Sequence, residues 1–278
     1  MKRTILITGA TDGIGKQIAK ILAAEGHFII IHGRTDETCQ STVKEIVNSQ
    51  PDAHLDYVSA DFSLLSNVNK MTETILQRFE HLNVLINNAG IYQSNKVITP
   101  DGFEMNLAVN YLAVYVLTCG LKNLLVKSSP SRIINVSSIA HKRGRIDLNQ
   151  LMNQQDHTFD GYKAYADSKL MLIYFSYFLA DELHGSGVTV NVLHPGVVST
   201  KMLKMGFNMT GEDVAVGAET PVFLAISPEM EEISGMYFDK KVSVPSSRLS
   251  YDLMAREEVM NWTKKVIEKG EWSGTVRS

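Results

Sequence analysis

A tyrosine four residues before a lysine can exchange a proton if both side chains face the same way. Tyrosine alone is a weak acid with a pKa of about 10, and a nearby ammonium group favours its anion. Residues four apart share a face only in a helix. The pattern occurs at Tyr92 with Lys96, at Tyr165 with Lys169 and at Tyr237 with Lys241. Only Tyr165 and Lys169 open a long apolar segment of helical spacing, whereas the other two pairs fall in a predicted loop and a predicted strand. We therefore select Tyr165 and Lys169 as the candidate catalytic pair.

A glycine-rich turn near the N-terminus could hold a diphosphate. Residues 8–15 read Thr-Gly-Ala-Thr-Asp-Gly-Ile-Gly, between a predicted strand at 3–7 and a predicted helix at 16–25. Gly9 permits a tight exit from the strand, Gly13 lets backbone N–H groups approach a pyrophosphate, and Gly15 lets the helix lie close to the sheet. The helix N-terminus would face the anion with the positive end of its dipole. A purely structural turn is the alternative.

The residue after the second predicted strand bears on which dinucleotide would bind. In dinucleotide-binding units, an acidic residue at about this distance from the glycine turn accepts a hydrogen bond from the adenosine ribose. Here the residue at this position is Arg34. A guanidinium group matches a 2′-phosphate, which a carboxylate would repel. We predict a preference for NADP(H), with NAD(H) as the alternative because Asp36 and Glu37 follow. The competing interpretation of Arg34 is a solvated surface charge.

These residues must be positioned by alternating strands and helices. Apolar runs of strand length recur along the chain, with segments of helical period between them and no linker-like composition. The predicted strands are residues 3–8, 28–32, 55–59, 84–87, 132–136, 189–193 and 235–238. The alternation predicts an α/β fold, a Rossmann-like doubly wound parallel sheet of about seven strands with helices on both faces. We predict one domain over residues 1–278, ending in a helix with a frayed tail over about 251–278.

Composition narrows the function classes. The 278 residues are 44% hydrophobic, enough for a sizeable core, and the net charge of −3 predicts no broad basic surface for nucleic acid. Cys39 and Cys119 are too few for a disulfide framework or a zinc ribbon, and no histidine pair has metal-ligand spacing. The N-terminus has no signal-peptide core, and the apolar stretches are interrupted by Asn110 and Ser176. We therefore predict a cytoplasmic protein with no metal and no membrane span that acts on a small molecule.

Together, the motifs resemble those of the short-chain dehydrogenase/reductase family over nearly the whole chain. The matching positions are residues 8–15, Asp61, residues 87–90, Asn110, residues 137–138, residues 165–169, residues 195–196 and Thr200. Residues 101–105, 109–112, 137–141 and 194–196 are most similar to the branch of retinol dehydrogenases and WW-domain oxidoreductases. The resemblance implies hydride transfer between a nicotinamide dinucleotide and a carbonyl or alcohol.

The resemblance also implies the catalytic roles. Tyr165 would be the general acid in reduction and the base in oxidation, with a phenol pKa lowered by Lys169 and the oxidised nicotinamide. Lys169 would also hold the nicotinamide ribose, and Ser138 would donate a hydrogen bond to the substrate oxygen. Asn110 would hold a water that relays protons through Lys169. Without the resemblance, we would interpret Asn110 as a buried amide bonded to the backbone.

The same comparison implies the cofactor contacts. Asp61 would cap the adenine ring, Asn87 and Gly90 would line the cofactor, and Thr200 would meet its carboxamide end. The predicted cofactor-binding residues are Gly9, Thr11, Asp12, Gly13, Ile14, Gly15, Arg34, Asp61, Asn87, Gly90, Tyr165, Lys169, Pro195, Gly196 and Thr200.

Two features depart from the common family pattern. Ser138 and Tyr165 are unusually far apart in the sequence, and we interpret the polar stretch at about 141–161 as a surface flap beside the substrate opening. Tyr162 stands before Lys169 at a spacing that some enoyl reductases of the family use. Enoyl reduction with Tyr162 is therefore an alternative function.

The segment at about 200–219 covers the substrate in this family. It contains apolar, adaptable side chains, Met202, Met205, Phe207 and Met209. We therefore predict a lipophilic or aromatic ketone, aldehyde or alcohol as substrate. The alternative is that these side chains seal a loop onto the core.

Two predicted helices, at 105–126 and 165–183, are apolar on more than one stripe. Such helices commonly face a second subunit, which favours a homodimer, with a thickly covered monomer as the alternative. A non-catalytic nucleotide sensor is the rival function, but it would not need Ser138, Tyr165 and Lys169 together.

Overall fold

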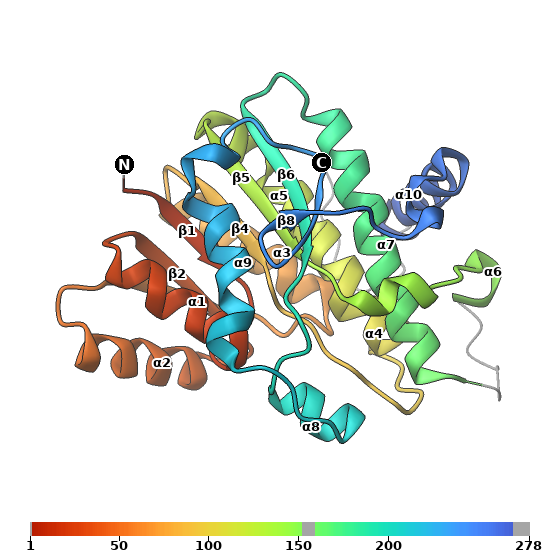
Figure 1. Cartoon of the computed structure of the whole chain (residues 1–278), viewed down its shortest axis with the longest axis horizontal. Helices are drawn as coiled ribbons and strands as arrows, with labels where there is room; N and C mark the ends of the chain where they lie inside the picture. Colours follow the sequence, from red (N-terminus) through yellow and green to blue (C-terminus); the bar gives the residue numbers. More distant parts are fainter. Residues whose placement is uncertain (1, 152–158, 269–278) are drawn as a thin grey trace.

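Three layers make up the computed structural model, which describes residues 2–151 and 159–268 without the side chains of Met205 and Phe207. A sheet lies between two layers of helices (Figure 1). Within the described residues the strand order is β3-β2-β1-β4-β5-β6-β7-β8, and every neighbouring pair is parallel except β7 with β8. The strands are β1 (Thr4–Ile7), β2 (Phe28–Gly33), β3 (His54–Ser59), β4 (Val84–Asn87), β5 (Ser131–Val136), β6 (Val188–His194), β7 (Tyr237–Asp239) and β8 (Val242–Ser243).

The predicted fold class is confirmed, with one additional short strand. β8 has two residues and pairs antiparallel with β7 at the edge of the sheet. A segment this short has no period that a sequence could reveal. The strand order reverses between β1 and β4, and in open α/β sheets ligands bind outside the carboxyl ends of the strands at this point.

Successive residues of each strand face opposite helix layers. Ile5 and Ile7 pack in the core beneath α1 and α9, whereas Leu6 packs in the core beneath α3, α5 and α7. The helices are α1 (Gly13–Ala24), α2 (Asp36–Ser49), α3 (Leu65–Arg78), α4 (Met105–Leu107), α5 (Ala113–Lys127), α6 (Leu148–Leu151), α7 (Gly161–Glu182), α8 (Lys201–Phe207), α9 (Val214–Ile226) and α10 (Leu253–Glu268). The shorter helical turns are η1 (Ala108–Leu112), η2 (Ile139–Arg143), η3 (Pro228–Met230) and η4 (Arg248–Tyr251).

The longest apolar stretch forms one helical segment, close to the predicted helix at 105–126. Because Asn110 does not break the helix, α4, η1 and α5 run on as one segment, Met105–Lys127. By length and mean hydropathy of 1.4 alone, this segment would suffice to cross a membrane. However, 72% of its most apolar 18-residue window is buried inside the fold, as in the core helix of a soluble protein.

Helix α10 covers apolar surface that could otherwise face another subunit. The Tyr111 hydroxyl lies 2.6 Å from the hydroxyl of Thr263 on α10, and Arg256 pairs with Asp181 of α7 at 2.9 Å. Val259 of α10 is buried in the same core as α5 and α7. The apolar stripes that favoured a homodimer are therefore at least partly covered within the chain. The predicted frayed tail from residue 269 onwards lies outside the described residues.

The predicted flap at 141–161 is only partly described. It begins inside η2, where His141 is fully buried, so this end of the segment is not on the surface. α6 follows, and residues 152–158 lie outside the described part of the chain.

Candidate active site

Tyr165 and Lys169 lie on α7, as their spacing predicts. Asp160 caps this helix by accepting hydrogen bonds from the N–H groups of Tyr162 and Lys163 at 2.8 and 3.1 Å. The Tyr165 hydroxyl is in hydrogen-bond contact with the side chain of Ser138, which follows β5. Lys169 Nζ lies 5.8 Å from the centroid of the Tyr165 ring. The structure therefore brings together Tyr165, Lys169 and Ser138 from two separate segments.

Burial sets the protonation of this pair. It lowers the pKa of Lys169 to about 8, and it raises the pKa of the Tyr165 phenol, an effect that the hydrogen bond to Ser138 partly offsets. The predicted lowering of the Tyr165 pKa by Lys169 together with an oxidised nicotinamide concerns the complex with the cofactor and stays a prediction. A phenol that stays protonated at neutral pH can donate a proton.

The end of β5 holds Lys169 at two points. Its ammonium group donates to the carbonyl of Val136 at 3.0 Å, and its own carbonyl accepts from the hydroxyl of Ser137 at 2.9 Å. The Lys169 side chain is only 4% exposed. The two adjacent serines therefore differ in their contacts: Ser137 anchors α7 to the sheet, whereas Ser138 contacts Tyr165.

Asn110 lies in η1, a single π-helical turn within the apolar segment. Such turns are frequent at functional sites. The Asn110 amide accepts from the N–H of Ile91 at 2.8 Å, and it donates to the Ile91 carbonyl at 3.0 Å and to Ser168 at 3.1 Å. This is the buried amide bonded to the backbone that we weighed against a role in proton relay. A Cβ atom on Gly90 would lie 3.2 Å from Lys169 Nζ and 3.3 Å from Asn110 Oδ1, so these three residues meet.

The glycine turn after β1 forms a cradle that side chains could not share. Gly9 and Gly13 have φ angles of +64° and +53°, which favour glycine. A Cβ atom on Gly15 would collide with the Gly9 carbonyl and with the side chain of Asn88. These glycines, together with the N-terminus of α1, fit the diphosphate of a dinucleotide.

Side chains outside the turn fix its shape. Asn88 Nδ2 donates to the carbonyls of Thr8 and Gly9 at 2.8 and 3.2 Å, and the hydroxyl of Thr8 accepts from the N–H of Asn88 at 2.9 Å. His32 Nδ1 accepts from the N–H of Gly9 at 3.1 Å. Burial lowers the pKa of His32 to about 4, so its ring is neutral and can accept this bond. Sequence reasoning missed His32 and Asn88 as supports, because their partners lie far away in the sequence.

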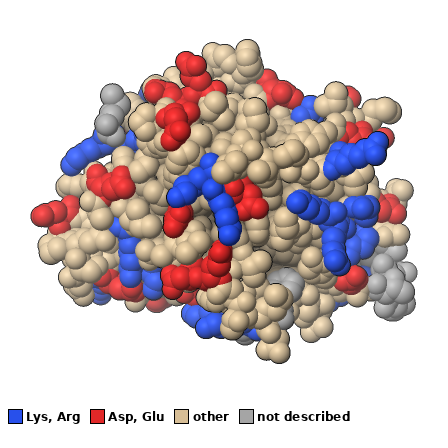
Figure 2. Space-filling model, in the orientation of Figure 1, with Lys and Arg blue, Asp and Glu red and all other residues tan. Residues whose placement is uncertain are grey.

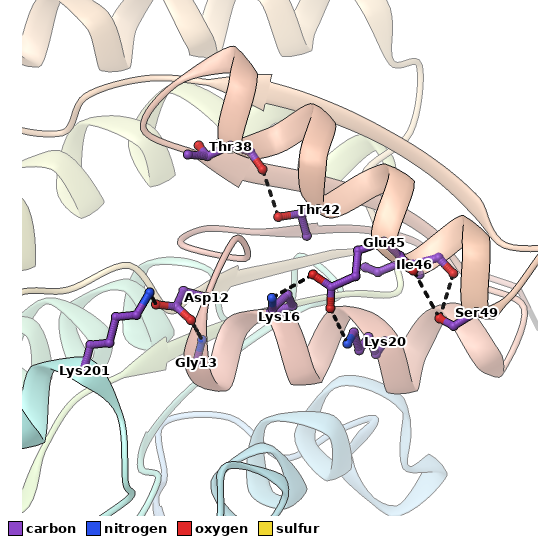
Figure 3. A network of polar contacts seen from close by, with 10 residues as sticks. All are labelled: Asp12, Gly13, Lys16, Lys20, Thr38, Thr42, Glu45, Ile46, Ser49 and Lys201. Carbon is purple, nitrogen blue, oxygen red and sulfur yellow. Dashed lines mark hydrogen bonds and ion pairs between the residues drawn. The ribbon is translucent and has the colours of Figure 1, made fainter.

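A cleft lies where the N-terminus of α1 meets α8. Helix α8 stands apart from the helix layers, at the lower edge of Figure 1. Asp12 caps α1 by accepting from Gly13 N at 2.9 Å, and it pairs with Lys201 of α8 at 2.8 Å (Figure 3). Thr200 caps α8 by accepting from Leu203 N at 3.2 Å. Its methyl group would lie 3.5 Å from a Cβ atom on Gly13, so Thr200 is next to the glycine turn.

The remaining predicted cofactor residues surround the same edge of the sheet. Arg34 is exposed directly after β2, and Thr11 packs against Gly33 at the end of that strand. Ile14 opens α1 and would be in contact with a Cβ atom on Gly217 of α9. Asp61 is half-buried after β3 and accepts from Ser63 N at 2.9 Å. Pro195 and Gly196 follow β6, and Gly196 has a φ angle of +93°.

Asn87, predicted to line the cofactor, turns its side chain into the protein. It is 1% exposed and donates to Thr118 at 3.0 Å and to Asn135 at 2.8 Å. The side chain therefore lies inside the protein, and only its main chain is available at the end of β4. Its neighbour Asn88 makes the contacts with the glycine turn.

An aromatic cluster surrounds Tyr165. Its ring meets that of Tyr92 edge-on at 5.6 Å between centroids, and Tyr162 packs on the same cluster with Ala140. The Tyr92 ring also lies against Gly206 of α8. The interpretation of the Tyr92 pattern as chance overlooked this position, because Tyr92 reaches the site as an apolar surface and not as half of a proton-transfer pair.

Comparisons with known proteins agree with this geometry. The family model of short chain dehydrogenases matches residues 3–210. The chain is 36% identical to retinol dehydrogenase 13 of Homo sapiens over 270 residues, which cover 91% of this chain and 81% of that protein. It is 32% identical to polyprenol dehydrogenase of Homo sapiens, covering 94% and 83% of the two chains.

A solved structure supports the same assignment. The crystal structure of a short chain dehydrogenase from Burkholderia cenocepacia in complex with NADP has a TM-score of 0.67 and 28% identity to this chain. The match covers 85% of this chain and 95% of that one. The family model, the sequence relatives and this solved structure thus point to the same family. The chain belongs to the short-chain dehydrogenase/reductase family of oxidoreductases, on its retinol dehydrogenase branch.

Proposed function

We propose that the protein transfers a hydride between NADP(H) and a lipophilic or aromatic carbonyl or alcohol. The observation that carries this proposal is the contact between the hydroxyl groups of Tyr165 and Ser138 at the carboxyl edge of the sheet, beside Lys169. The glycine turn at the end of β1 lies on the same edge. A site for the acid and a site for the dinucleotide are therefore adjacent.

The protein's own residues move the proton and stabilise charge. A bound nicotinamide dinucleotide would supply the hydride to the carbonyl carbon in reduction and accept it in oxidation. In reduction Tyr165 gives its phenol proton to the carbonyl oxygen as the C=O π bond breaks, which leaves an alcohol and a tyrosinate. Ser138 donates a hydrogen bond to the same oxygen. The Lys169 ammonium stabilises the tyrosinate and holds the ribose hydroxyls.

Asn110 has a supporting role in this proposal. Its bonds to both polar groups of the Ile91 backbone fix the loop that passes Gly90 and Lys169. The relay of protons through a water at Asn110 stays a prediction. Main-chain groups of Asn87, Pro195 and Gly196 and the side chains of Asp61 and Thr200 are proposed as further cofactor contacts.

The aromatic cluster supports a lipophilic substrate. The Tyr92 ring packs edge-on against the Tyr165 ring, Tyr162 packs on the same cluster, and α8 lies against Tyr92. Amphipathic rings of this kind favour apolar or aromatic ligands. The named substrates of two relatives, retinol and polyprenol, are alcohols, in agreement with this class.

Arg34 supports a preference for NADP(H). Its side chain is exposed after β2, and among the residues that the structure describes it has no ion-pair partner. Asp36, which could oppose a phosphate there, accepts a hydrogen bond from Ser59 at 2.6 Å. The NADP complex of the Burkholderia cenocepacia relative agrees with this preference.

A carbonyl panel tests substrate and cofactor together. Purified protein is mixed with NADPH or NADH and with lipophilic aldehydes, aromatic ketones or polar sugars, and loss of the reduced-nicotinamide absorbance is followed. We expect faster turnover of the lipophilic and aromatic compounds with NADPH. Faster turnover of polar sugars would contradict the substrate class, and equal turnover with NADH would contradict the cofactor preference.

Enoyl reduction is the second candidate, because Tyr162 lies in the same cluster as Tyr165. Enone substrates in the panel distinguish the two reactions, since enoyl reduction saturates the C=C bond and carbonyl reduction converts the C=O group to an alcohol. A non-catalytic sensor would bind NADPH without consuming it under any of these conditions.

Partners and location are also proposals. Basic and acidic side chains occur in separate groups on the face shown in Figure 2, which offers no broad basic surface on that face. Because Met105–Lys127 is largely buried, we propose that this segment does not span a membrane and that the protein is cytoplasmic. Fractionation of cells that produce it would test this location, and sedimentation of the purified chain would test the predicted homodimer.

A further inference from the structure

Two histidine rings hold the peptide group that follows Ser138. His141 Nδ1 lies 2.6 Å from the carbonyl oxygen of Ser138. On the other side of the same peptide group, the N–H of Ile139 donates to His194 Nδ1 at 3.3 Å. His141 comes from η2 and His194 from the end of β6, so two separate segments contact this one peptide.

The hydrogen bonds require opposite tautomers of the two rings. A carbonyl oxygen can only accept, so His141 carries its proton on Nδ1, and its Nε2 accepts from the N–H of Ser247 at 3.0 Å. His194 accepts at Nδ1, so its proton is on Nε2.

Burial keeps both rings in place and neutral. His141 is fully buried with its ring 5.0 Å from that of Tyr237, and His194 is 8% exposed. Burial lowers the pKa of both histidines, that of His141 to about 4. Each ring can therefore keep its tautomer at neutral pH.

This peptide group begins at Ser138, so the two rings hold the backbone that carries the Ser138 side chain. Ser138 Oγ accepts from Ala140 N at 3.2 Å and is also in contact with the Tyr165 hydroxyl. Because this backbone carries Oγ, a displacement of the backbone at Ser138 would move Oγ relative to the Tyr165 hydroxyl. We propose that His141 and His194 are positioning residues that fix the Ser138 hydroxyl for the reaction, an inference that rests on the proposed function.

The arrangement also connects the site to the C-terminal part of the chain. Ser247, whose N–H reaches His141, follows Ser246, which lies 2.7 Å from the Tyr177 hydroxyl and 2.6 Å from Ser250 Oγ. These serines lie beyond the matched family region, residues 3–210. A segment outside that region thus supports the ring that holds the Ser138 peptide.

Paired substitutions separate positioning from general stability. His141→Ala and His194→Ala remove the ring contacts, whereas His141→Asn and His194→Asn retain a group at the Nδ1 position that can donate or accept. We expect each alanine variant to lower kcat about ten- to a hundredfold, less than the roughly 10²- to 10³-fold effect of removing a transition-state donor. The dissociation constant for NADPH should change less than about twofold. Each asparagine variant should recover kcat to within about threefold of the wild type.

The matched control is His184→Ala, which removes an exposed ring after α7. It should leave kcat unchanged. The double variant His141→Ala with His194→Ala should have a kcat at most about threefold below that of the more impaired single variant, because both rings hold one peptide. Independent losses that multiply, or asparagine variants as impaired as alanine variants, would overturn the proposal.

A spectroscopic measurement on the wild-type protein tests the arrangement without turnover. Long-range ¹H–¹⁵N correlation of the imidazole nitrogens near neutral pH should show His141 protonated on Nδ1 and His194 on Nε2. Like tautomers or a charged ring would overturn the proposal even if no carbonyl is turned over. Absence of turnover with the expected tautomers would instead contradict the proposed function.

Discussion

The turn after β1 and the turn after β5 lie at the same edge of the sheet but are shaped in different ways. In the glycine turn, Gly9 and Gly13 adopt positive φ angles and Gly15 leaves no room for a side chain, so the residue types themselves determine the path. In the turn after β5, Ser138 has extended backbone angles that any residue can adopt, φ −153° and ψ 155°. Its position depends on His141 and His194.

The difference predicts that the two turns respond differently to substitution. A turn encoded by glycines fails when any side chain is added, whereas a turn held by distant side chains changes by small displacements. The binding half should therefore respond to substitutions by loss of cofactor affinity, and the reacting half by loss of kcat.

Tyr165→Phe should give the largest effect. Removing the phenol hydroxyl removes the proton donor, which contributes about 10²- to 10⁴-fold to rate. We expect kcat for carbonyl reduction to fall by that factor while NADPH affinity is nearly unchanged, as measured by steady-state turnover and cofactor titration.

Tyr162→Phe is the matched control on the same helix, one turn earlier. It should retain most of the activity. If Tyr162→Phe abolished turnover and Tyr165→Phe did not, the reaction would be assigned to enoyl reduction.

Acid should loosen the glycine turn through His32. The folded-state pKa of His32 is about 4 and its ordinary value is 6.5. Between these values the unfolded chain binds a proton that the folded chain does not, so stability should fall as pH decreases from 6.5 to 4. The loss from this residue should reach about 3 kcal/mol.

His32→Asn keeps an acceptor for the N–H of Gly9 but cannot titrate. Urea unfolding at a series of pH values should show a shallower loss of stability for this variant, with a remaining slope from His141, whose pKa is lowered in the same way. An unchanged slope would show that His32 is not the titrating group.

Arg34→Glu should change the choice of cofactor. It replaces a cation that can pair with a 2′-phosphate by an anion that repels it. We expect the affinity for NADPH to fall about thirtyfold or more, since a charged hydrogen bond contributes about 1.5–3 kcal/mol, while NADH affinity falls little. Equal losses for both cofactors in a fluorescence titration would place Arg34 away from the phosphate.

Gly15→Ala should damage the glycine turn with a smaller effect. The added methyl group would meet the Gly9 carbonyl and Asn88, and overpacking of this kind costs about 1–3 kcal/mol. We expect NADPH affinity to fall about tenfold. Gly185→Ala is the control, because its Cβ would have nothing within 4 Å and it lies after α7. This control should lose some stability through its positive φ but bind NADPH as before.

The sequence predicted the parts of the molecule that local pattern determines. Apolar runs of strand length, separated by segments of helical period, predicted the parallel sheet. The glycine spacing predicted the turn after β1, and the spacing of Tyr165 and Lys169 predicted that both lie on one helix. The edge strand β8 was too short to predict, and the spacing of apolar residues did not reveal the π-helical turn at Asn110 inside the predicted helix.

The supports of the site could not be predicted, because they depend on contacts between distant segments. His32, Asn88 and His194 act on residues that lie beside them only after the sheet has formed. Burial also raises the pKa of the Tyr165 phenol, an effect that the spacing of residues does not reveal. The sequence pattern selected the proposed reacting groups, and contacts between distant segments determine how these groups are held.

The central claim is that hydride passes between a reduced nicotinamide and a lipophilic carbonyl with Tyr165 as the proton donor. The protein should be incubated with NADPH deuterated on the transferable position and a lipophilic aldehyde, and the product examined by mass spectrometry. We predict an alcohol that carries the deuterium on its carbinol carbon with the wild-type protein and no alcohol above background with Tyr165→Phe. Alcohol without deuterium, or labelled alcohol formed equally by Tyr165→Phe, would contradict the account.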